Sequence, residues 1–266
     1  MPAHPSILLF DSGLGGLTVA RAVAARRPDA QLVYLADDAG FPYGELAEDA
    51  LIERVLRIVG TTIEAQRPDL VVIACNTAST LALAPLREKF SVPFVGTVPA
   101  IKPACAQSKS RMVSVLGTKA TVDREYTRAL IREFAGGCDV TLVGSARLAR
   151  FAEAELDSAP ASDADIAAES APCFVERDGR RTDTVVLACT HYPLLLARLR
   201  KLSPWPVEWI DPAPAIARRV VDLLGPAGGA KPPPPRVIFT SGRTPSPRLA
   251  AALAQFGLGQ PVQGSA

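Results

Sequence analysis

The chain has 266 residues, of which 48% are hydrophobic and 21% are charged, so it is long enough for a full core in one large domain or two compact ones. Its 29 Lys and Arg nearly balance its 27 Asp and Glu, and the basic residues form no sustained run, which argues against a nucleic-acid partner. No apolar run approaches the roughly 18 to 20 residues that span a bilayer, so no membrane partner is expected.

The compartment follows from the cysteines and the N-terminus. Five cysteines at irregular spacing make a poor disulfide framework, and the first residues do not read as a signal peptide. We therefore expect a cytoplasmic protein.

The first half alternates short apolar stretches with amphipathic ones, as βαβ units of a mainly parallel sheet do. Strands are predicted over residues 7–10, 31–35, 69–74 and 93–98, and helices over 17–26, 48–66 and after Cys75. The turn Asp11-Ser12-Gly13-Leu14-Gly15-Gly16 completes no nucleotide-binding fingerprint. It is either a tight turn that needs glycine or a ligand-facing turn with a carboxylate, a hydroxyl and free backbone N–H groups.

The same pattern restarts near Arg111. It predicts strands over residues 112–116, 140–143, 183–188 and 207–210, and helices over 121–133 and 214–224, with a helical tail inside 158–172. A proline-rich linker at 225–235 leads to a last strand at 237–240, a last helix at 246–255 and a loose tail to 266. The fold class is therefore α/β, with two pseudo-symmetric doubly wound domains. The first comprises residues 1–97 plus about 207–266, and the second residues 98–206.

Two cysteines lie in near-identical strings, Cys75 in VVIACNTAST and Cys189 in VVLACTHYPL, each directly after an apolar run and an alanine. Each string reads as a buried parallel strand that ends at a helix start, and ligands bind beyond the carboxyl ends of such strands. Two like domains would then present two thiols to one cleft, which suits a reaction on two mirror-image faces of a substrate. A helix N-terminus stabilises a thiolate, and Asn76, Thr77, Thr190 and His191 supply hydrogen-bond donors.

Other interpretations of these residues stay open. The cysteines can be small buried hydrophobes, a redox pair, or, with His191, zinc ligands, although no C-x-x-C spacing supports zinc. Pro42-Tyr43-Gly44 is either an ordinary turn or a binding loop, and Thr118 and Thr121 are either helix caps or donors to a carboxylate.

The strings together resemble the cofactor-independent aspartate/glutamate racemase family. The matching segments are FDSGLGGLTV, YLADDAGFPYGE, ACNTAS, VPAIKPA, VLGTKATV and DTVVLACTHYPLL, which occur in the family's order between residues 7 and 224. The loop with Pro42-Tyr43-Gly44 favours the glutamate-specific members.

The resemblance implies two facing domains with the active site between them, glutamate as the small-molecule substrate, and neither cofactor nor metal. Cys75 and Cys189 would be the acid/base pair, the first removing the α-proton of D-glutamate and the second that of L-glutamate. Asp11 and His191 would be their polar partners, and Glu153 would assist Cys189. The implied substrate-binding residues are Asp11, Ser12, Pro42, Tyr43, Gly44, Asn76, Thr77, Thr118, Thr121, Thr190 and His191.

The sequence leaves several points undecided. A racemase of aspartate or another acidic amino acid, and a non-catalytic amino-acid-binding protein, are the alternatives. Gly144-Ser145-Ala146 stands where the family has Ala-Cys-Pro, so either Glu153 is out of register or this wall of the cleft is built differently. Cys105, Cys138 and Cys173 are taken as structural. A homodimer is compatible with the resemblance, but the sequence does not determine the oligomeric state. The expected product, D-glutamate, is used in peptidoglycan synthesis.

Overall fold

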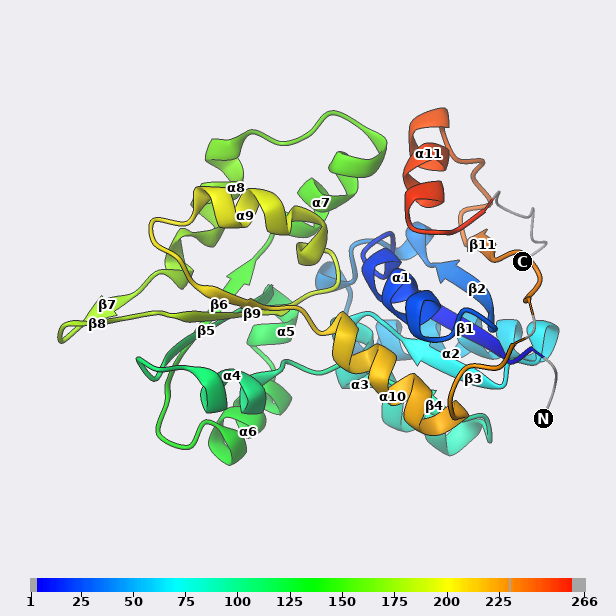
Figure 1. Cartoon of the computed structure of the whole chain (residues 1–266), viewed down its shortest axis with the longest axis horizontal. Helices are drawn as coiled ribbons and strands as arrows, with labels where there is room; N and C mark the ends of the chain where they lie inside the picture. The colour runs from blue at the N-terminus through cyan, green and yellow to red at the C-terminus, as the bar shows by residue number, and fades with distance from the viewer. Residues whose placement is uncertain (1–3, 230, 260–266) are drawn as a thin grey trace. The chain divides into compact units, whose positions relative to one another are not determined.

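The structure, a computed structural model, describes residues 4–229 and 231–259. The chain forms two compact units, one from the chain up to Thr97 together with the chain from Ala213 onward, the other from Val98–Pro212. Strand β10 (Glu208–Ile210) pairs with β9 (Thr184–Ala188) in the second unit, whereas the sequence pattern suggested a boundary before it, near residue 207. Figure 1 shows the chain coloured from its N-terminus to its C-terminus.

The first unit contains a five-stranded sheet in which every pair of neighbouring strands is parallel. Its strands are, in spatial order, β11 (Arg236–Phe239), β2 (Gln31–Ala36), β1 (Ser6–Asp11), β3 (Leu70–Ile73) and β4 (Phe94–Val95). The central strands read as continuous apolar runs because helices cover both faces of the sheet.

Alternation along the strands assigns the helices of this unit to the two faces. Helices α2 (Glu48–Gln66) and α3 (Asn76–Lys89) pack on the face that carries Leu8, Phe10, Val33, Leu35, Val71 and Ile73. Helices α1 (Leu17–Arg26) and α10 (Ala213–Leu224) pack against each other, so the two chain segments that form this unit meet in one layer. The short helices η1 (Asp38–Gly40) and η2 (Tyr43–Glu45) follow β2, and α11 (Pro247–Gln255) follows β11.

The second unit contains a four-stranded parallel sheet in the order β10-β9-β5-β6, where β5 is Met112–Thr118 and β6 is Asp139–Ser145. Helices α4 (Ile101–Gln107) and α6 (Glu125–Phe134) pack on one face, around Val113, Val115 and Val186. The remaining elements are α5 (Lys119–Val122), α7 (Leu148–Asp157), α8 (Asp163–Ser170), η3 (Ala171–Cys173), η4 (Tyr192–Leu195) and α9 (Leu196–Leu202).

The two sheets have the same topology. Strands β1 to β4 lie in the order 2-1-3-4, and the four strands of the second sheet, numbered along the chain, lie in that order as well. In each sheet the third strand lies beside the first, and a cysteine follows shortly after its end. The predicted class, two pseudo-symmetric α/β domains with mainly parallel sheets, is confirmed.

Several elements of the second unit differ from the prediction. The helix expected over residues 121–133 is two helices, α5 and α6, and α4, α7 and α9 were not predicted. An antiparallel hairpin, β7 (Glu176–Arg177) and β8 (Arg180–Arg181), also escaped prediction because its strands are short, charged and exposed. Its Asp178-Gly179 turn has positive φ at both residues, the usual signal of a two-residue hairpin loop. The tail expected to be loose lies mostly outside the described residues.

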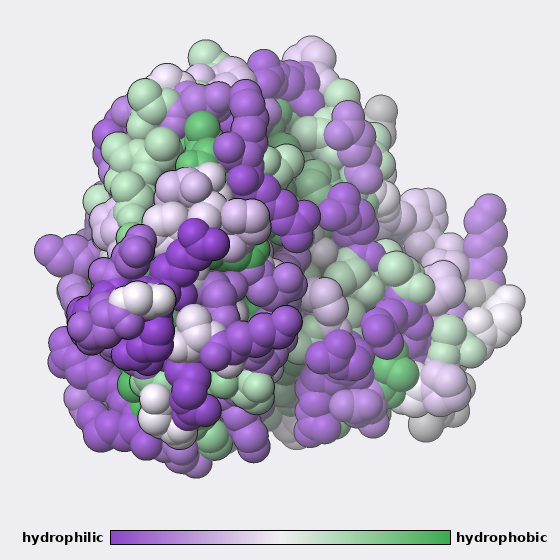
Figure 2. Space-filling model, turned by 60° about the vertical axis from the view of Figure 1, so that its left-hand side comes forward, coloured by the Kyte–Doolittle hydropathy of each residue, from purple (hydrophilic) through white to green (hydrophobic). Residues whose placement is uncertain are grey.

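Hydrophilic residues predominate on the face of the molecule shown in Figure 2, and strongly hydrophobic residues appear there only in small separate areas. Within the part of the chain that the structure describes, no helix is both long enough and apolar enough to cross a membrane.

Helix α5 lies so close to β6 that Gly144 admits no side chain. A Cβ atom at this position would lie 2.9 Å from Val122 Cγ2 and 3.0 Å from the backbone Cα of Lys119. We expect Gly144→Ala to lower the free energy of unfolding by about 1–3 kcal/mol, because the helix must move away from the sheet.

Urea unfolding measures this loss. The matched control is Gly229→Ala, since nothing lies within 4 Å of the added Cβ there. Equal stabilities of the two variants would contradict the tight packing of α5.

Candidate active site

The strand register brings the first cysteine beside the turn after β1. Strand β1 pairs in parallel with β3, with Phe10 opposite Ile73, and Ala74 N donates to Phe10 O at 2.8 Å. The residues that follow each strand, Ser12 and Cys75, therefore meet at the carboxyl edge of the sheet. The Cys75 thiol donates to Ser12 Oγ at 3.5 Å, and both side chains are buried.

Two hydrogen bonds to Gly13 hold the turn that carries Asp11 and Ser12. Asp11 Oδ2 accepts a hydrogen bond from Gly13 N at 3.0 Å, and the buried Tyr34 hydroxyl donates to Gly13 O at 2.8 Å. A Cβ at Gly16 would lie 2.9 Å from Asp11 Cβ, so glycine is required here for close packing. The turn thus meets the structural demand for glycine and still places a carboxylate and a hydroxyl beside Cys75.

Cys75 is the N-cap residue of α3, so its sulfur lies where the helix dipole stabilises negative charge. The next two residues, Asn76 and Thr77, are buried in the first turn of the helix. Neither polar atom of the Asn76 side chain has a hydrogen-bond partner among the residues that the structure describes. Such a buried unpaired amide costs about 1–3 kcal/mol, and it is the kind of group that a bound ligand satisfies.

The loop Pro42-Tyr43-Gly44 is anchored through its tyrosine. The Phe41–Pro42 peptide bond is cis, and the Tyr43 ring is buried and tilted against Phe10, 6.3 Å between centroids. The Tyr43 hydroxyl donates to Asp37 Oδ2. The Tyr43 side chain therefore holds the loop in place.

Asp37 is fully buried and accepts hydrogen bonds from three other parts of the unit. Arg54 of α2 binds both carboxylate oxygens, with Nε at 2.5 Å and Nη2 at 2.7 Å, and Thr240, after β11, donates from Oγ1 at 2.6 Å. The sequence analysis did not identify Asp37, Arg54 or Thr240. An Asp-Asp pair directly after a strand end was the available signal.

These contacts set the protonation states around the loop. Burial alone would raise the pKa of Asp37, but hydrogen bonds from Arg54, Thr240 and Tyr43 and the Arg54 charge bring it below its ordinary value. Burial and the Asp37 carboxylate raise the pKa of Tyr43 far above the ordinary range, and a thiolate at Cys75 raises it further. Tyr43 therefore remains a neutral donor close to the first cysteine.

The second cysteine occupies the equivalent place in the other sheet. Gly117 of β5 pairs with Ala188 of β9, so Thr118, the last residue of β5, lies at the same sheet edge as Cys189, which follows β9. Cys189 Sγ lies 3.9 Å from His191 Nδ1, and His191 Nε2 lies 2.8 Å from Glu153 Oε1. Cys189 and His191 are buried, as is Thr190 between them, whereas the Glu153 side chain is 19% exposed.

Ser145 accounts for the position of Glu153. Its hydroxyl accepts hydrogen bonds from Leu148 N at 3.0 Å and Arg147 N at 3.3 Å, and donates to Glu169 Oε2 at 2.6 Å. It therefore satisfies free N–H groups at the start of α7. The Gly144-Ser145-Ala146 string thus has a local structural reason, and it starts the helix in a register that brings Glu153 to His191.

Thr118 and Thr121 act as a helix cap within this unit. Thr118 Oγ1 accepts a hydrogen bond from Thr121 N at 3.2 Å, and the two hydroxyls lie 2.9 Å apart. Thr121 is fully buried, and its carbonyl accepts from Thr127 Oγ1 at 2.6 Å. The capping interpretation therefore accounts for these hydrogen bonds.

A buried tyrosine accompanies the second cysteine as Tyr43 accompanies the first. The Tyr192 hydroxyl donates to Gly117 O at 2.9 Å. Burial raises the pKa of Tyr192 well above its ordinary value, and the nearby Cys189 raises it further. Each site cysteine thus has a permanently protonated phenol in its vicinity.

The other three cysteines are Cys105, Cys138 and Cys173, and all five cysteines are free thiols. Burial, with a hydrogen bond to Cys138, raises the pKa of Cys105 to about 12, and burial raises that of Cys173 to about 12. These two remain thiols at neutral pH. Among the residues that the structure describes, no group of three or more His, Cys, Asp or Glu side chains is arranged to hold a metal ion.

Comparison with known proteins places the chain in a family. Residues 18–220 match the family described as Asp/Glu/Hydantoin racemase. Glutamate racemase of Brucella anthropi is 57% identical over 225 residues, which cover 84% of this chain and 81% of the relative. Glutamate racemase of Mesorhizobium japonicum is 51% identical over 261 residues, covering 97% and 96%.

Solved structures agree with this placement. The crystal structure of Escherichia coli glutamate racemase in complex with L-glutamate and the activator UDP-MurNAc-ala is 38% identical. It has a TM-score of 0.87 and covers 98% of this chain and 100% of its own. The chain belongs to the Asp/Glu/Hydantoin racemase family.

The lowered pKa of Asp37 predicts a pH dependence of stability. A carboxylate with a lowered folded pKa stabilises the fold at pH values above its unfolded pKa, and this contribution is lost as the pH falls through the folded value. Asp37→Asn should therefore cost about 1–3 kcal/mol near neutral pH, since it leaves buried donors of Arg54 and Thr240 poorly paired. Its stability should also fall less steeply on acidification than that of the parent.

Urea unfolding at a series of pH values below neutral measures both effects. Asp222→Asn is the control, because its carboxylate is exposed and lies 4.0 Å from Arg219. An Asp37→Asn variant that follows the parent's acid profile would refute the role of this carboxylate.

Proposed function

We propose that this chain is a glutamate racemase that interconverts L- and D-glutamate by acid/base catalysis with two thiols. The observation that carries the proposal is the duplication of a buried cysteine, Cys75 and Cys189, after the third strand of two sheets with the same topology. Membership of the family and 51–57% identity to proteins named glutamate racemase support the substrate.

The reaction needs a base on one face of the α-carbon and an acid on the other. In the proposed mechanism each thiol acts on one face of the α-carbon. One thiolate removes the α-proton, and the opposite thiol returns a proton to the other face, so each turnover exchanges the protonation states of the two sulfurs. Because the two enantiomers have equal free energy in achiral water, no net driving force is required.

His191 and Glu153 prepare the second thiol. An ionised carboxylate only accepts hydrogen bonds, so the contact at 2.8 Å favours a proton on His191 Nε2. Nδ1 then faces Cys189 Sγ as an acceptor, 3.9 Å away. In the proposed mechanism the imidazole takes the thiol proton when Cys189 acts as a base and returns it when Cys189 acts as an acid.

The first thiol has a different environment. Ser12 accepts its hydrogen bond, the N-terminus of α3 favours the thiolate, and the Asp11 carboxylate lies in the adjoining turn. The carbanion-like transition state places negative charge on the substrate carboxylate. We assign its stabilisation to the Asn76 amide, the hydroxyls of Ser12, Thr77 and Thr190, and the backbone of Pro42-Tyr43-Gly44. The threonines of the α5 cap, Thr118 and Thr121, complete the proposed lining.

The complex of the Escherichia coli structure with L-glutamate supports this choice of ligand. Five free thiols fit a reducing compartment, and we place the enzyme in the cytoplasm, where D-glutamate is supplied for peptidoglycan synthesis.

Hydrogen exchange in D₂O tests the reaction directly. We expect the α-proton NMR signals of both L- and D-glutamate to disappear with the parent protein. Cys75→Ser and Cys189→Ser should each slow racemisation by about 10²- to 10⁴-fold, the usual contribution of a positioned acid or base.

Three outcomes would refute the proposal in different ways. Exchange with aspartate but not with glutamate would change the substrate. Binding of glutamate without exchange would indicate a binding protein. Full activity in either serine variant would exclude the two-thiol mechanism.

Asn76 predicts a trade-off between activity and stability. If its unpaired amide binds the substrate carboxylate, Asn76→Ala loses a hydrogen bond to a charged group worth about 1.5–3 kcal/mol, or roughly 10- to 150-fold in kcat/KM. The free energy of unfolding should not decrease, because the variant removes a buried polar group that lacks a partner among the described residues.

The control lies one helical turn further along α3. Ser79 Oγ donates to Ile73 O at 2.9 Å and accepts from Thr97 N at 3.1 Å. Ser79→Ala should therefore show the opposite pattern, with lower stability and nearly unchanged kcat/KM. Loss of stability without loss of activity in Asn76→Ala would contradict the assignment.

A further inference from the structure

Helix α7 is attached at two points to the chain segment that follows Cys189. Glu153 contacts His191 just before η4, and Glu155 contacts Arg198 in α9. The two glutamates are two residues apart, so they project from different faces of α7. The two attachments come from a single stretch of chain, because η4 and α9 are contiguous.

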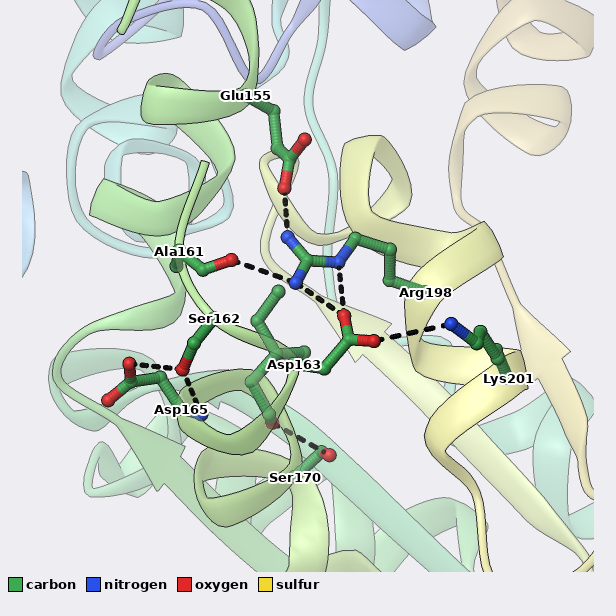
Figure 3. A network of polar contacts seen from close by, with 9 residues as sticks. Glu155, Ala161, Ser162, Asp163, Asp165, Ser170, Arg198 and Lys201 are labelled. Carbon is green, nitrogen blue, oxygen red and sulfur yellow. Dashed lines mark hydrogen bonds and ion pairs between the residues drawn. The ribbon is translucent and has the colours of Figure 1, made fainter. Parts of the chain in front are cut away.

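Arg198 uses its whole guanidinium group in this arrangement, as Figure 3 shows. Nη1 donates to Glu155 Oε1, Nε and Nη2 donate to Asp163 Oδ1 at 3.0 and 2.5 Å, and Nη2 also donates to Ala161 O at 2.8 Å. Glu155 belongs to α7, Ala161 to the following loop and Asp163 to the start of α8. One side chain thus joins α9 to the end of α7 and to the two segments after it.

Two attachments on different faces of a helix restrict its rotation, which a single attachment does not. A rotation of α7 that moved Glu153 away from His191 would also move Glu155 away from Arg198. Packing alone is a weaker restraint, because the residues of α7 that are buried are Leu148, Ala149 and Ala152, all in its first half, whereas both glutamates lie beyond them. Beyond these residues, Glu153 and Glu155 attach the helix through polar contacts.

We propose that Arg198 is a positioning residue for the second thiol. By binding Glu155, Ala161 and Asp163 it fixes the rotation of α7, so that Glu153 stays on His191 Nε2 and His191 Nδ1 acts as the acceptor for Cys189. The proposal rests on the proposed function for its kinetic consequence, but its structural consequence, the position of the proton on His191, is measured without substrate.

The contacts explain why arginine is required at this position. Lysine offers a single ammonium centre, whereas the planar guanidinium reaches Glu155 on one side and Asp163 on the other. Lys201, one turn further along α9, binds the same Asp163 through Oδ2 at 3.3 Å and is 74% exposed. In Figure 3 its ammonium group is joined to Asp163 and not to Glu155. It is therefore a matched control that has the same charge and the same acidic partner.

Nitrogen NMR of the imidazole is the decisive measurement. The chain has two histidines, and His4→Gln leaves His191 alone; His4 Nδ1 has no hydrogen-bond partner among the described residues. In this His4→Gln background we expect the Nε2-protonated tautomer of neutral His191. Adding Arg198→Met should shift the spectrum toward the tautomer mixture seen on adding Glu153→Gln, whereas adding Lys201→Met should leave it unchanged.

Kinetics provide the second readout. Arg198→Met should lower kcat/KM by about tenfold, less than the ~100-fold that a misplacement of about 1 Å can cost. Equal free energies of L- and D-glutamate require the same factor in both directions. The pH profile of kcat/KM should change with Arg198→Met and keep its shape with Lys201→Met. A loss of folded protein alone would scale the whole profile and leave the tautomer as it is.

Glu155→Gln keeps the Arg198–Asp163 pair and tests the same link should Arg198→Met fail to fold. We expect it to reproduce the change in tautomer in part. An unchanged His191 spectrum in Glu155→Gln, or in a folded Arg198→Met variant, would overturn the proposal. A parent protein with the expected tautomer but no glutamate exchange would instead refute the proposed function and leave the positioning of His191 standing.

Discussion

The parallel register of two strand pairs is the constraint on which both sites depend. Pairing of Phe10 with Ile73 and of Gly117 with Ala188 makes neighbouring strands end level, so the residues that follow them meet at one edge. Backbone hydrogen bonds set this register, and close packing keeps it, because a slip of one residue would exchange the side chains of different size that pack against the helices on the two faces. The cysteines are therefore placed by the interior of each sheet.

Two carboxylates then fix the orientation of groups that the strands alone do not determine. Asp37 connects the loop with Tyr43 to α2 and to the chain after β11, and Glu153 orients His191 beside Cys189. In both units a carboxylate that need not touch substrate determines the direction in which another group points. The two units differ in the groups that they use: a hydroxyl and a helix N-terminus serve Cys75, whereas an imidazole serves Cys189.

The sequence was most informative where local pattern decides structure. The strands that precede Cys75 and Cys189 are apolar runs that end in helix-start residues, and their duplication predicted the two like sheets. Contacts between residues far apart in the chain could not be predicted from the sequence. Thr240 meets Asp37 and Arg198 meets Glu155 through tertiary packing, which no local pattern in the sequence indicates. The unpaired amide of Asn76 appears only when its surroundings are known.

The first unit is discontinuous in sequence, and this has a consequence for synthesis on the ribosome. Strand β11 pairs with β2, and Thr240 completes the contacts of Asp37. Both come from the last part of the chain, more than 100 residues after β5 begins at Met112. The second unit is a single segment and can fold as soon as it emerges. The anchored Tyr43 loop is thus among the last features to form, so an incomplete nascent chain carries both thiols without a finished site.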